Sequence, residues 1–586
     1  MRRRSAVSSV LATCALVSAS PVGAQVPPAP APGPAPAATP YVFGGVPAPF
    51  GTFPFLAVLL RAVPGGFAVY CGGTLVRPDL VLTAAHCVVG QAPPDLVVIG
   101  QASAAPTPDA LGDSRVVAEV VVDPSYAVAS NSHDLALLRL SEPATRRPAH
   151  RVRPATGSLA AVGAVGVGMG FGSTVADDEQ FVAPIELQQT PLTVQPDSAC
   201  ADAYGAAAYL SDRMLCAGAL GSGVCRGDSG GPLAVAGPTR WWAVAGVVSF
   251  GAVDCDDAPA AFTDLSEAGN DAWLTSVVGE RAALWSVERI AGSDRFATAT
   301  AISQSAFPGG AATAFVVTGD AFPDALAVGP VAAMAGAPVV LVQRNSVPAV
   351  TRTELERLDP DRIVVVGGTG AVGEGTVAAL ATIAPVERVG GDAGDRVGTA
   401  VAVATDWAPG ASTVYVANGF AFPDALAGGV AAARDGAPLL LVEQNALPAA
   451  TAAYLQGARP TRIVVLGGTT AVDDSVVAAL AGVSGATVER IAGTNRYGTA
   501  AAVAARSFPT GSPLPVALVA TGENYPDALS ATPAAFLAGA PVLLTPPGFA
   551  AAEVFTDLYR SRVASVRVLG AAGAVADAAV AELTAG

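Results

Sequence analysis

The chain has 586 residues, of which 52% are hydrophobic and 14% are charged, and its formal net charge is −16. This length is too great for one hydrophobic core, so several domains are expected, and the composition is that of a globular rather than a disordered protein. All of its basic residues are arginine. The acidic balance argues against nucleic acid or an anionic membrane as a partner, because binding to either needs positive patches.

The N-terminus has the pattern of an export signal. Three arginines at 2–4 precede an apolar stretch at 6–19, and small residues follow it before Gln25. We therefore expect a signal peptide at 1–24 and then an extended, Pro/Ala-rich propeptide at 25–41. The apolar stretch is short for a membrane span of roughly 20 residues. The mature chain is thus expected to have no transmembrane segment.

Export places the cysteines in an oxidising compartment. Cys14 would leave with the signal peptide, although a poor match to a lipoprotein cleavage box at 11–14 leaves lipid anchoring as a minor alternative. An even number then remains, which predicts three disulfides whose pairing the spacing leaves open. Without a C-x-x-C spacing, no zinc or other metal site is expected, and no cofactor is implied. The six cysteines are Cys71, Cys87, Cys200, Cys216, Cys225 and Cys255.

Short apolar runs follow one another from residue 42 to residue 278. Runs such as 55–60, 116–122 and 243–250 are rich in valine and leucine and are separated by glycine, proline, asparagine and aspartate. Many short strands with turn signals between them predict an all-β sandwich or barrel.

Three motifs in this region carry the chemistry. His86 stands in Thr-Ala-Ala-His-Cys, Asp134 in His-Asp-Leu-Ala-Leu-Leu and Ser229 in Gly-Asp-Ser-Gly-Gly-Pro. A serine hydroxyl is a weak nucleophile and needs a base such as histidine, which a carboxylate then orients. Each motif alone is common in structural roles, but their joint occurrence in the order His, Asp, Ser predicts a catalytic triad.

On these motifs, residues 42–278 resemble the chymotrypsin/trypsin family of serine proteases. The resemblance implies a double β-barrel, with His86 as general base, Asp134 as its orienting partner and Ser229 as nucleophile. It also implies that the backbone N–H groups of Gly227 and Ser229 form the oxyanion hole. The disulfides implied by the family are Cys71–Cys87, Cys200–Cys216 and Cys225–Cys255.

Zymogen activation is implied by the same resemblance. Val42 would become the new N-terminus and bury its ammonium against Asp228, a charge that needs such a partner. The preceding residue is Tyr41, whereas trypsin-activated relatives have Arg or Lys there. The activating protease is therefore open, and self-cleavage is one possibility.

The substrate pocket is expected to be apolar and shallow. Gly223 stands at the base, where trypsin-like enzymes have an aspartate, and Val224 and Ala260 add apolar surface. Ser249 and Gly251 resemble the edge that binds the substrate backbone, with an open entrance. This arrangement predicts elastase-like cleavage after small to medium apolar residues.

Three internal repeats begin after about residue 279, with offsets of about one hundred residues. We place them at 287–384, 385–484 and 487–586. Each opens with Glu-Arg-Ile or Glu-Arg-Val, continues with Asp-Arg or Asn-Arg and then a Thr-Ala pair, and contains Pro-Asp-Ala-Leu before a buried-type strand. Apolar strands alternate with Ala/Leu-rich helical stretches, which predicts α/β units with a parallel sheet covered on both faces.

Two other signals in the repeats are judged to be misleading. The uncharged run 325–342 is as long as a membrane span, but glycines and prolines interrupt it, and its counterpart in the second repeat contains Arg434 and Asp435. Residues 368–373 match G-x-G-x-x-G, but the second repeat lacks two of these glycines. We interpret this segment as a tight strand-to-helix turn rather than a dinucleotide site.

The repeats resemble the cell-wall-binding repeat 2 family, which implies attachment to an anionic cell-wall polymer. Arg295, Arg396 and Arg496 are candidate contacts because guanidinium suits phosphate and carboxylate; the alternative is that they pair with acidic residues within the fold. The third repeat has Gly570-Ala571 where the others have Gly-Gly, a departure that could weaken a site there.

The sequence as a whole therefore predicts a secreted serine endopeptidase that is retained at the cell wall of a Gram-positive bacterium and acts on protein or peptide substrates. One alternative is a surface adhesion protein whose protease domain stays an unprocessed zymogen, which the Tyr41 junction keeps open. Another is that the repeats bind substrate rather than wall.

Overall fold

The computed structural model describes residues 45–585. It leaves out 50–51, 65, 101–112, 145, 174–185, 219–220, 222, 238–241, 253–254, 256, 279–284, 322, 391–394, 422, 510–512 and 525–526. The expected signal peptide, the propeptide and Val42 lie outside the described residues.

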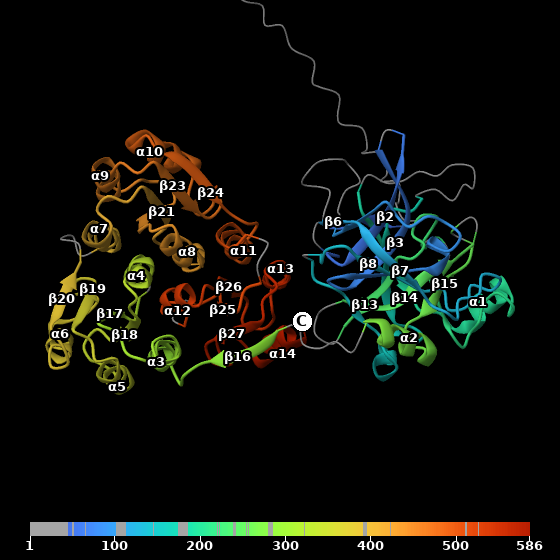
Figure 1. The fold of residues 1–586 in the computed structure, drawn as a ribbon, viewed down its shortest axis with the longest axis horizontal. Helices are drawn as coiled ribbons and strands as arrows, with labels where there is room; N and C mark the ends of the chain where they lie inside the picture. The colour runs from blue at the N-terminus through green and yellow to red at the C-terminus, as the bar shows by residue number, and fades with distance from the viewer. Residues whose placement is uncertain are drawn as a thin grey trace, which may run out of the picture. The chain divides into compact units, whose positions relative to one another are not determined.

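The first part of the chain contains two sheets, antiparallel except for the short parallel pair β9·β14 (Figure 1). One has the strand order β6-β5-β2-β3-β4-β8-β7, and the other has the order β1-β11-β10-β13-β14-β15-β12 with β9 beside β14. These barrel-type sheets confirm the expected all-β double-barrel class. The strands of the first sheet are β2 Leu56–Val63, β3 Gly66–Arg77, β4 Leu80–Thr83, β5 Leu96–Ile99, β6 Asp113–Arg115, β7 Val117–Val122 and β8 Ala136–Leu140.

Residues from both sheets form the cores of this part, and few helices accompany them. The helical elements are η1 Ala85–Cys87, η2 Pro154–Ala160, α1 Asp197–Tyr204 and α2 Ala268–Val278. The strands of the second sheet are β1 Val46–Pro47, β9 His150–Arg151, β10 Val165–Gly170, β11 Gln188–Thr193, β12 Met214–Ala217, β13 Pro232–Ala236, β14 Trp242–Phe250 and β15 Ala260–Asp264.

The repeats form three four-stranded sheets, and every strand pair in them is parallel. This confirms the predicted parallel α/β units, in which the inner strands are mostly apolar because helices cover both faces, whereas the Glu-Arg strands β16, β20 and β24 are part-exposed. The strands are β16 Ser286–Ile290, β17 Thr313–Thr318, β18 Val339–Val342, β19 Arg362–Val366, β20 Val386–Val389, β21 Thr413–Asn418, β22 Leu439–Val442, β23 Arg462–Leu466, β24 Thr487–Ile491, β25 Ala517–Thr521, β26 Val542–Thr545 and β27 Ser565–Leu569.

The sheets are offset from the sequence repeats by one strand. The Glu-Arg-Ile segment that opens a repeat pairs with the sheet of the preceding repeat, so the orders are β18-β17-β19-β20 and β22-β21-β23-β24. The third sheet has the order β26-β25-β27-β16, which means that the first strand of the first repeat completes it. The three repeats therefore close into a ring.

Helices α4, α8 and α12, one from each repeat, contact one another at the centre of this ring and share one apolar core (Figure 1). None of the helices in the described part of the chain combines the length and apolar character of a membrane span. The helices are α3 Arg295–Ala306, α4 Pro323–Met334, α5 Ala349–Leu358, α6 Glu374–Leu380, α7 Arg396–Trp407, α8 Pro423–Arg434, α9 Ala449–Ala458, α10 Asp474–Ser484, α11 Arg496–Ser507, α12 Ala531–Leu537, α13 Ala552–Arg560 and α14 Asp577–Ala585.

These elements show what the possible membrane span and the possible dinucleotide motif of the sequence are in the fold. The apolar run 325–342 is divided between α4 and β18, with a turn at Gly336, whose φ is 62°. The glycine-rich segment 368–373 connects β19 to α6 as a tight turn.

Candidate active site and repeat-interface sites

The three predicted triad residues come from both sheets. His86 lies in η1, directly after β4, and Asp134 precedes β8, so the first sheet positions both. Ser229 lies in a turn before β13 of the second sheet. The sheets approach closely here, because the Gly72 N–H donates to the Ser229 carbonyl oxygen at 2.7 Å. A Cβ on Gly72 would lie 3.0 Å from the Cα of Gly231, so a glycine is needed for this approach.

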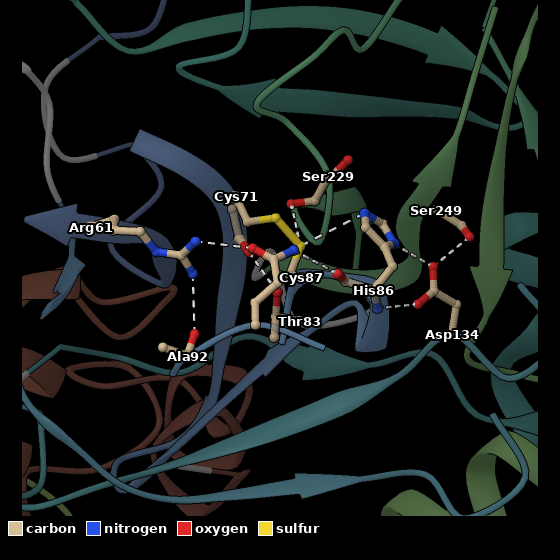
Figure 2. The surroundings of a disulfide bond; sticks show 11 residues. Arg61, Cys71, Thr83, His86, Cys87, Ala92, Asp134, Ser229 and Ser249 are labelled. Atoms are coloured by element: carbon tan, nitrogen blue, oxygen red, sulfur yellow. Dashed lines mark hydrogen bonds and ion pairs between the residues drawn. A yellow bond between two sulfur atoms is a disulfide. The ribbon is translucent and has the colours of Figure 1, made fainter. Parts of the chain in front are cut away.

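A buried carboxylate orients the histidine (Figure 2). Asp134 is 0% exposed, and its Oδ2 lies 2.7 Å from Nδ1 of His86, while its Oδ1 accepts the His86 backbone N–H at 2.9 Å. The Ser249 hydroxyl also donates to Oδ2 at 2.6 Å. With Nδ1 facing the carboxylate, the proton resides on Nδ1 and the lone pair of Nε2 is available to accept one.

Ser229 and His86 each have an atom near Sγ of Cys87, one of the two sulfurs of the Cys71–Cys87 disulfide. The Ser229 carbonyl oxygen lies 3.7 Å from Sγ of Cys87, and Nε2 of His86 lies 3.8 Å from the same atom. The Ser229 hydroxyl has no hydrogen-bond partner among the described residues, and Figure 2 draws none between it and the imidazole. Such contacts commonly tighten only when substrate binds.

The turn that contains Ser229 leaves two donors free. In the described part of the chain, the N–H groups of Gly227 and Ser229 make no hydrogen bond. Gly227 has φ of 96° and Gly230 has φ of 80°, values that favour glycine. Two unpaired backbone donors beside a candidate nucleophile are suited to stabilise an oxyanion.

Asp228 is a buried acid without a charged partner among the described residues. It is 1% exposed, and its carboxylate accepts the N–H groups of Gly172 at 2.8 Å and Cys225 at 2.9 Å. Burial raises the pKa of Asp228 to about 6, and the two backbone donors oppose this only in part. The acid is therefore placed to gain from a nearby cation.

The five predicted pocket residues are small, apolar or uncharged. A Cβ on Gly223 would lie 3.0 Å from the Cys255 carbonyl oxygen, and one on Gly251 would lie 3.7 Å from Cβ of Ala260. Gly251, at the predicted entrance of the pocket, is therefore close to Ala260, at its predicted floor. Val224 is buried in the same apolar cluster as Ala260. The fifth residue, Ser249, is buried and directs its hydroxyl to the carboxylate of Asp134.

The structure contains three disulfides, and they are the pairs that the family resemblance implied. His86 and two of these cysteines form the only cluster of metal-ligand type found among the described residues, and its sulfurs are already bonded to each other. The disulfides are Cys71–Cys87, Cys200–Cys216 and Cys225–Cys255.

One supporting residue of the aspartate loop was missed by the sequence analysis. Buried Asn270 of α2 has its Oδ1 2.7 Å from Nδ1 of His133, the neighbour of Asp134, and its Nδ2 donates to the Asp264 carbonyl oxygen at 2.7 Å. His133 has φ of 52°, a left-handed backbone conformation that is uncommon outside glycine. A lone asparagine in a helix has no sequence signal for this role.

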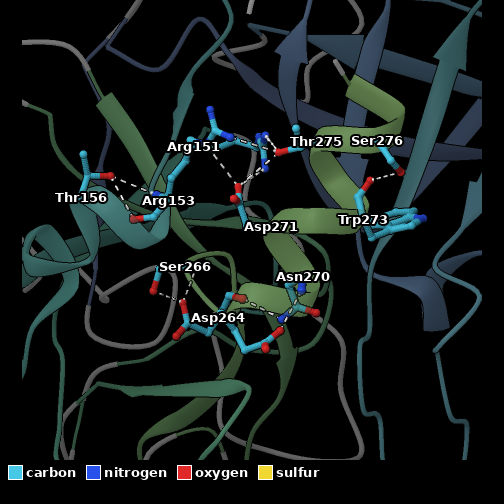
Figure 3. A network of polar contacts seen from close by, with 11 residues as sticks. Arg151, Arg153, Thr156, Asp264, Ser266, Asn270, Asp271, Trp273, Thr275 and Ser276 are labelled. Atoms are coloured by element: carbon cyan, nitrogen blue, oxygen red, sulfur yellow. Dashed lines mark hydrogen bonds and ion pairs between the residues drawn. The ribbon is translucent and has the colours of Figure 1, made fainter. Parts of the chain in front are cut away.

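The same helix is tied to the body of the domain by two arginines (Figure 3). Asp271 accepts from Arg151 at 3.2 Å and from Arg153 at 3.3 Å, and Thr275 accepts from both. Burial lowers the pKa of Arg151, and Asp271 counters this only in part. The network holds α2, and with it Asn270, against the second sheet.

In the repeats, the three candidate wall-binding arginines each have an internal partner. Each stands at the first position of a helix whose preceding Asp or Asn caps it through a side-chain oxygen. Each donates from Nη1 to the backbone carbonyl of the glycine that directly follows the next strand along the chain. The pairs are Arg295 to Gly319 at 2.6 Å, Arg396 to Gly419 at 2.8 Å and Arg496 to Gly522 at 2.6 Å.

The Pro-Asp-Ala-Leu aspartates, to which the sequence analysis gave no role, lie where repeats meet. Each carboxyl interacts with a threonine and an arginine of the following repeat, and the third repeat meets the first in the same way. Burial raises the pKa of each carboxyl, that of Asp324 to about 6. The partners are Asp324 with Thr399 and Arg396, Asp424 with Thr499 and Arg496, and Asp527 with Thr298 and Arg295.

These aspartates explain the first glycine of each Gly-Gly or Gly-Ala pair. Gly367, Gly467 and Gly570 have φ of 111°, 99° and 99°, and an added Cβ would lie 2.6, 2.5 and 2.5 Å from the carboxylate of their own repeat. The second position of the pair does not need a positive φ. Ala571 in the third repeat therefore leaves the local backbone unchanged.

Open cavities lie at two of these junctions in the part of the chain that the structure describes. The cavity between the second and third repeats has a volume of about 450 Å³ and includes Asp424, Arg496 and Phe420 in its lining. The cavity between the third and first repeats has a volume of about 220 Å³ and includes Asp527 and Arg295. Pseudo-equivalent residues thus form both sites.

The fold and the sites define a serine-protease-type domain followed by a ring of three parallel α/β repeats. Comparison with known families agrees: residues 42–270 match the Trypsin family model, and the Cell wall binding domain 2 model matches 289–377, 388–477 and 490–580. The chain belongs to the trypsin family through its first domain, and it carries three cell-wall-binding repeats. It is thus a protease-like protein associated with the cell wall.

Individual relatives match one half of the chain or the other. A trypsin of Saccharopolyspora erythraea is 34% identical over 34% of this chain and 86% of its own length. The N-acetylmuramoyl-L-alanine amidase LytC of Bacillus subtilis is 31% identical over 42% of this chain, which spans about half (47%) of the amidase. The solved structure of Cwp6 from Clostridium difficile is 26% identical, with a TM-score of 0.48, over 51% of this chain and 48% of its own.

Proposed function

We propose that the protein is a secreted serine endopeptidase held at the wall of a Gram-positive bacterium, with His86, Asp134 and Ser229 as its triad. The observation that carries this proposal is the 2.7 Å contact between Nδ1 of His86 and buried Asp134, with Nε2 of His86 and the Ser229 carbonyl oxygen both within 3.8 Å of Sγ of Cys87. A carboxylate in this position keeps Nε2 ready to accept a proton, which is the requirement for activating a serine.

The reaction is then acyl transfer. Ser229 attacks the substrate carbonyl as Nε2 of His86 takes its proton, and the free N–H groups of Gly227 and Ser229 receive the developing oxyanion. His86 returns the proton to the leaving amine, and water hydrolyses the acyl-enzyme by the same steps. The apolar residues Val224 and Ala260 favour small to medium apolar side chains in the pocket.

Activation is proposed to depend on Asp228. Its buried carboxylate is disfavoured in the charged form, and the ammonium of a new N-terminus at Val42 would supply the missing cation. Cleavage after Tyr41 therefore couples to the shape of the Ser229 turn. A chain that is not cleaved there would serve as a wall-binding protein without activity.

Wall attachment is proposed to come from the repeats, which bind an anionic wall polymer. The LytC match and the three-fold occurrence of the same junction support this role, because several weak sites on one chain raise residence by effective concentration. Since Arg295, Arg396 and Arg496 each donate to a backbone carbonyl, and Arg396 has further internal contacts, the polymer is proposed to reach these arginines only at donors that the internal contacts leave unused.

The first test is intact-mass analysis of the secreted protein after treatment with a fluorophosphonate, with Ser229→Ala as the control. One adduct on a chain that begins at Val42, absent from the control, is expected. No adduct on a chain that retains residues before Val42 would favour the zymogen. No adduct with Val42 exposed would contradict the catalytic proposal.

A further inference from the structure

The two junction cavities are built from equivalent segments but differ in size and charge. The larger, between the second and third repeats, has one acid and one arginine in its lining, Asp424 and Arg496. The smaller has two acids, Asp294 and Asp527, against Arg295. An anionic polymer is therefore repelled less at the larger cavity.

The larger cavity also has an aromatic wall that the other repeats do not reproduce. Phe420 lies two residues after the end of β21 and is 58% exposed. The residues at the same place in the first and third repeats are Asp320 and Glu523. Glu523 accepts a hydrogen bond from the Tyr497 hydroxyl at 2.5 Å, so the third repeat has a hydrogen-bonded acid where the second has an exposed aromatic ring.

Contacts with Arg396 and Asn418 fix the position of the Phe420 side chain. The Arg396 guanidinium stacks on Phe420 at 4.4 Å from the ring centroid, and the same arginine donates to the Gly419 carbonyl oxygen at 2.8 Å. The Phe420 N–H donates to Oδ1 of Asn418 at 2.7 Å, and Asn418 in turn donates to the Ala471 carbonyl oxygen at 2.7 Å. The exposed phenyl ring is therefore pre-organised rather than a loose surface side chain.

Three polar side chains of the same cavity have no internal partner among the described residues. The side chains of Gln444, Thr470 and Thr494 line the cavity, are exposed and make no hydrogen bond among the described residues. A flat apolar face beside free hydroxyl and amide groups matches a sugar ring, which has an apolar C–H face and a rim of hydroxyls.

We propose that the cavity between the second and third repeats binds a sugar ring of the anionic wall polymer, stacked on Phe420. This inference rests on the proposed wall-binding function and names the junction and the side chain that carry it. The three repeats are then functionally unequal. The Phe420 side chain and the balanced charge make the junction between the second and third repeats the main contact, and the acid-lined junction between the third and first repeats contributes less.

The test measures binding to purified Gram-positive wall sacculi by full-length protein carrying Ser229→Ala, which prevents self-cleavage. Phe420→Ala and Phe420→Leu are compared with Phe420→Trp, and Leu537→Ala is the matched control because Leu537 is a similarly exposed apolar residue (50%) outside this cavity. Sacculi stripped of their anionic glycopolymer by acid distinguish that polymer from peptidoglycan.

We expect Phe420→Ala and Phe420→Leu to weaken binding by at least about fivefold, the usual effect of losing an aromatic anchor, and Phe420→Trp and Leu537→Ala to bind like the parent. Equal binding by Phe420→Ala and the parent would overturn the sugar site alone, as would undiminished binding to stripped sacculi. Failure of the parent to bind any sacculi would overturn wall attachment and the sugar site together.

Discussion

At the residue scale, the proposed substrate pocket depends on the absence of side chains at two positions. Gly223 faces the Cys255 carbonyl oxygen and Gly251 faces Cβ of Ala260, so the space proposed for a substrate side chain is the space that these glycines leave. Because a Cβ on Gly251 would make ordinary contact with Ala260 at 3.7 Å, a larger residue there should be tolerated by the fold.

Gly251→Val is therefore expected to narrow the entrance without unfolding the domain. The added methyl groups should reduce kcat/KM for a peptide with leucine before the scissile bond by about tenfold or more relative to one with alanine. Kinetics on the two peptides, corrected by active-site titration, measure the ratio. An unchanged ratio would mean that Gly251 does not border the pocket.

A second residue-scale prediction concerns the buried acid of the first junction. Burial raises the pKa of Asp324 to about 6, above the ordinary value of 3.8, so the folded state holds the proton more strongly than the unfolded state. This contribution to stability is greatest below about pH 4 and is lost as the pH rises to about 6.

Asp324→Asn should remove that dependence. The free energy of unfolding of the variant, relative to the parent, is expected to rise by on the order of 2 kcal/mol between pH 4 and pH 7. Urea unfolding followed by tryptophan fluorescence measures it, with the exposed carboxyl of Asp361 as control through Asp361→Asn. A parallel pH profile for parent and variant would contradict the assigned cause.

At the scale of elements, β16 is the strand that closes the ring. It pairs with β27 along five residues, and the preceding Trp285 is buried, donating from Nε1 to the Leu583 carbonyl oxygen at 2.8 Å. Its ring packs against Tyr559 and Phe555 with centroids 5.2 and 6.4 Å away. The start of the first repeat is thus anchored in the core of the third.

Trp285→Ala should weaken the pairing of β16 with β27 that closes the ring of repeats. Loss of a buried tryptophan is expected to cost about 3–5 kcal/mol, and hydrogen exchange should accelerate in β16 and β27. The pair β19·β20 is an internal control, because it is the same junction between the first and second repeats. Equal acceleration in both pairs would indicate general destabilisation instead of ring opening.

The sequence predicts the length of each repeat but not which strands share a sheet. Internal similarity gives the period of about one hundred residues, and the apolar runs give parallel strands, but Glu387-Arg388 opens a repeat in the sequence and completes the preceding sheet in space. A periodic sequence has no natural starting point, so the strand exchange has no local signal. The contact between Asp527 of the third repeat and Thr298 of the first likewise joins residues that only the closed ring brings together.

The proposed triad could be assigned from the sequence because its motifs are local. The Thr-Ala-Ala-His-Cys segment encodes a short helical turn with a disulfide cysteine, the Gly-Asp-Ser-Gly-Gly-Pro segment encodes a glycine-rich turn, and the proposed chemistry follows from residue type. Asn270, which supports the loop before Asp134, lies in a helix far along the chain and follows no such pattern. Contacts of this kind depend on the packing of α2, which single residues do not reveal.

At the scale of the whole molecule, the two halves have separate hydrophobic cores. Every apolar cluster of buried residues lies wholly before residue 279 or wholly after residue 284. Each half therefore buries its own apolar surface, which is the physical condition for a domain that folds as a unit. Catalysis and attachment should then be separable.

A chain that ends after Val278 is expected to keep its kcat/KM on a soluble peptide within about twofold of the full-length enzyme, because every proposed catalytic and pocket residue precedes this point. It should lose retention on wall sacculi. On a protein substrate fixed to the same sacculi, its rate should fall by about a hundredfold, since tethering raises the effective concentration of the enzyme by that order.

Full-length protein carrying Phe420→Ala is the matched comparison, because its protease half is unaltered and only its attachment is weakened. Its rate on the tethered substrate should lie between those of the parent and the truncated chain, with an unchanged rate on the soluble peptide. A truncated chain that cleaves the tethered substrate as fast as the parent would show that the repeats do not deliver the protease to its substrate.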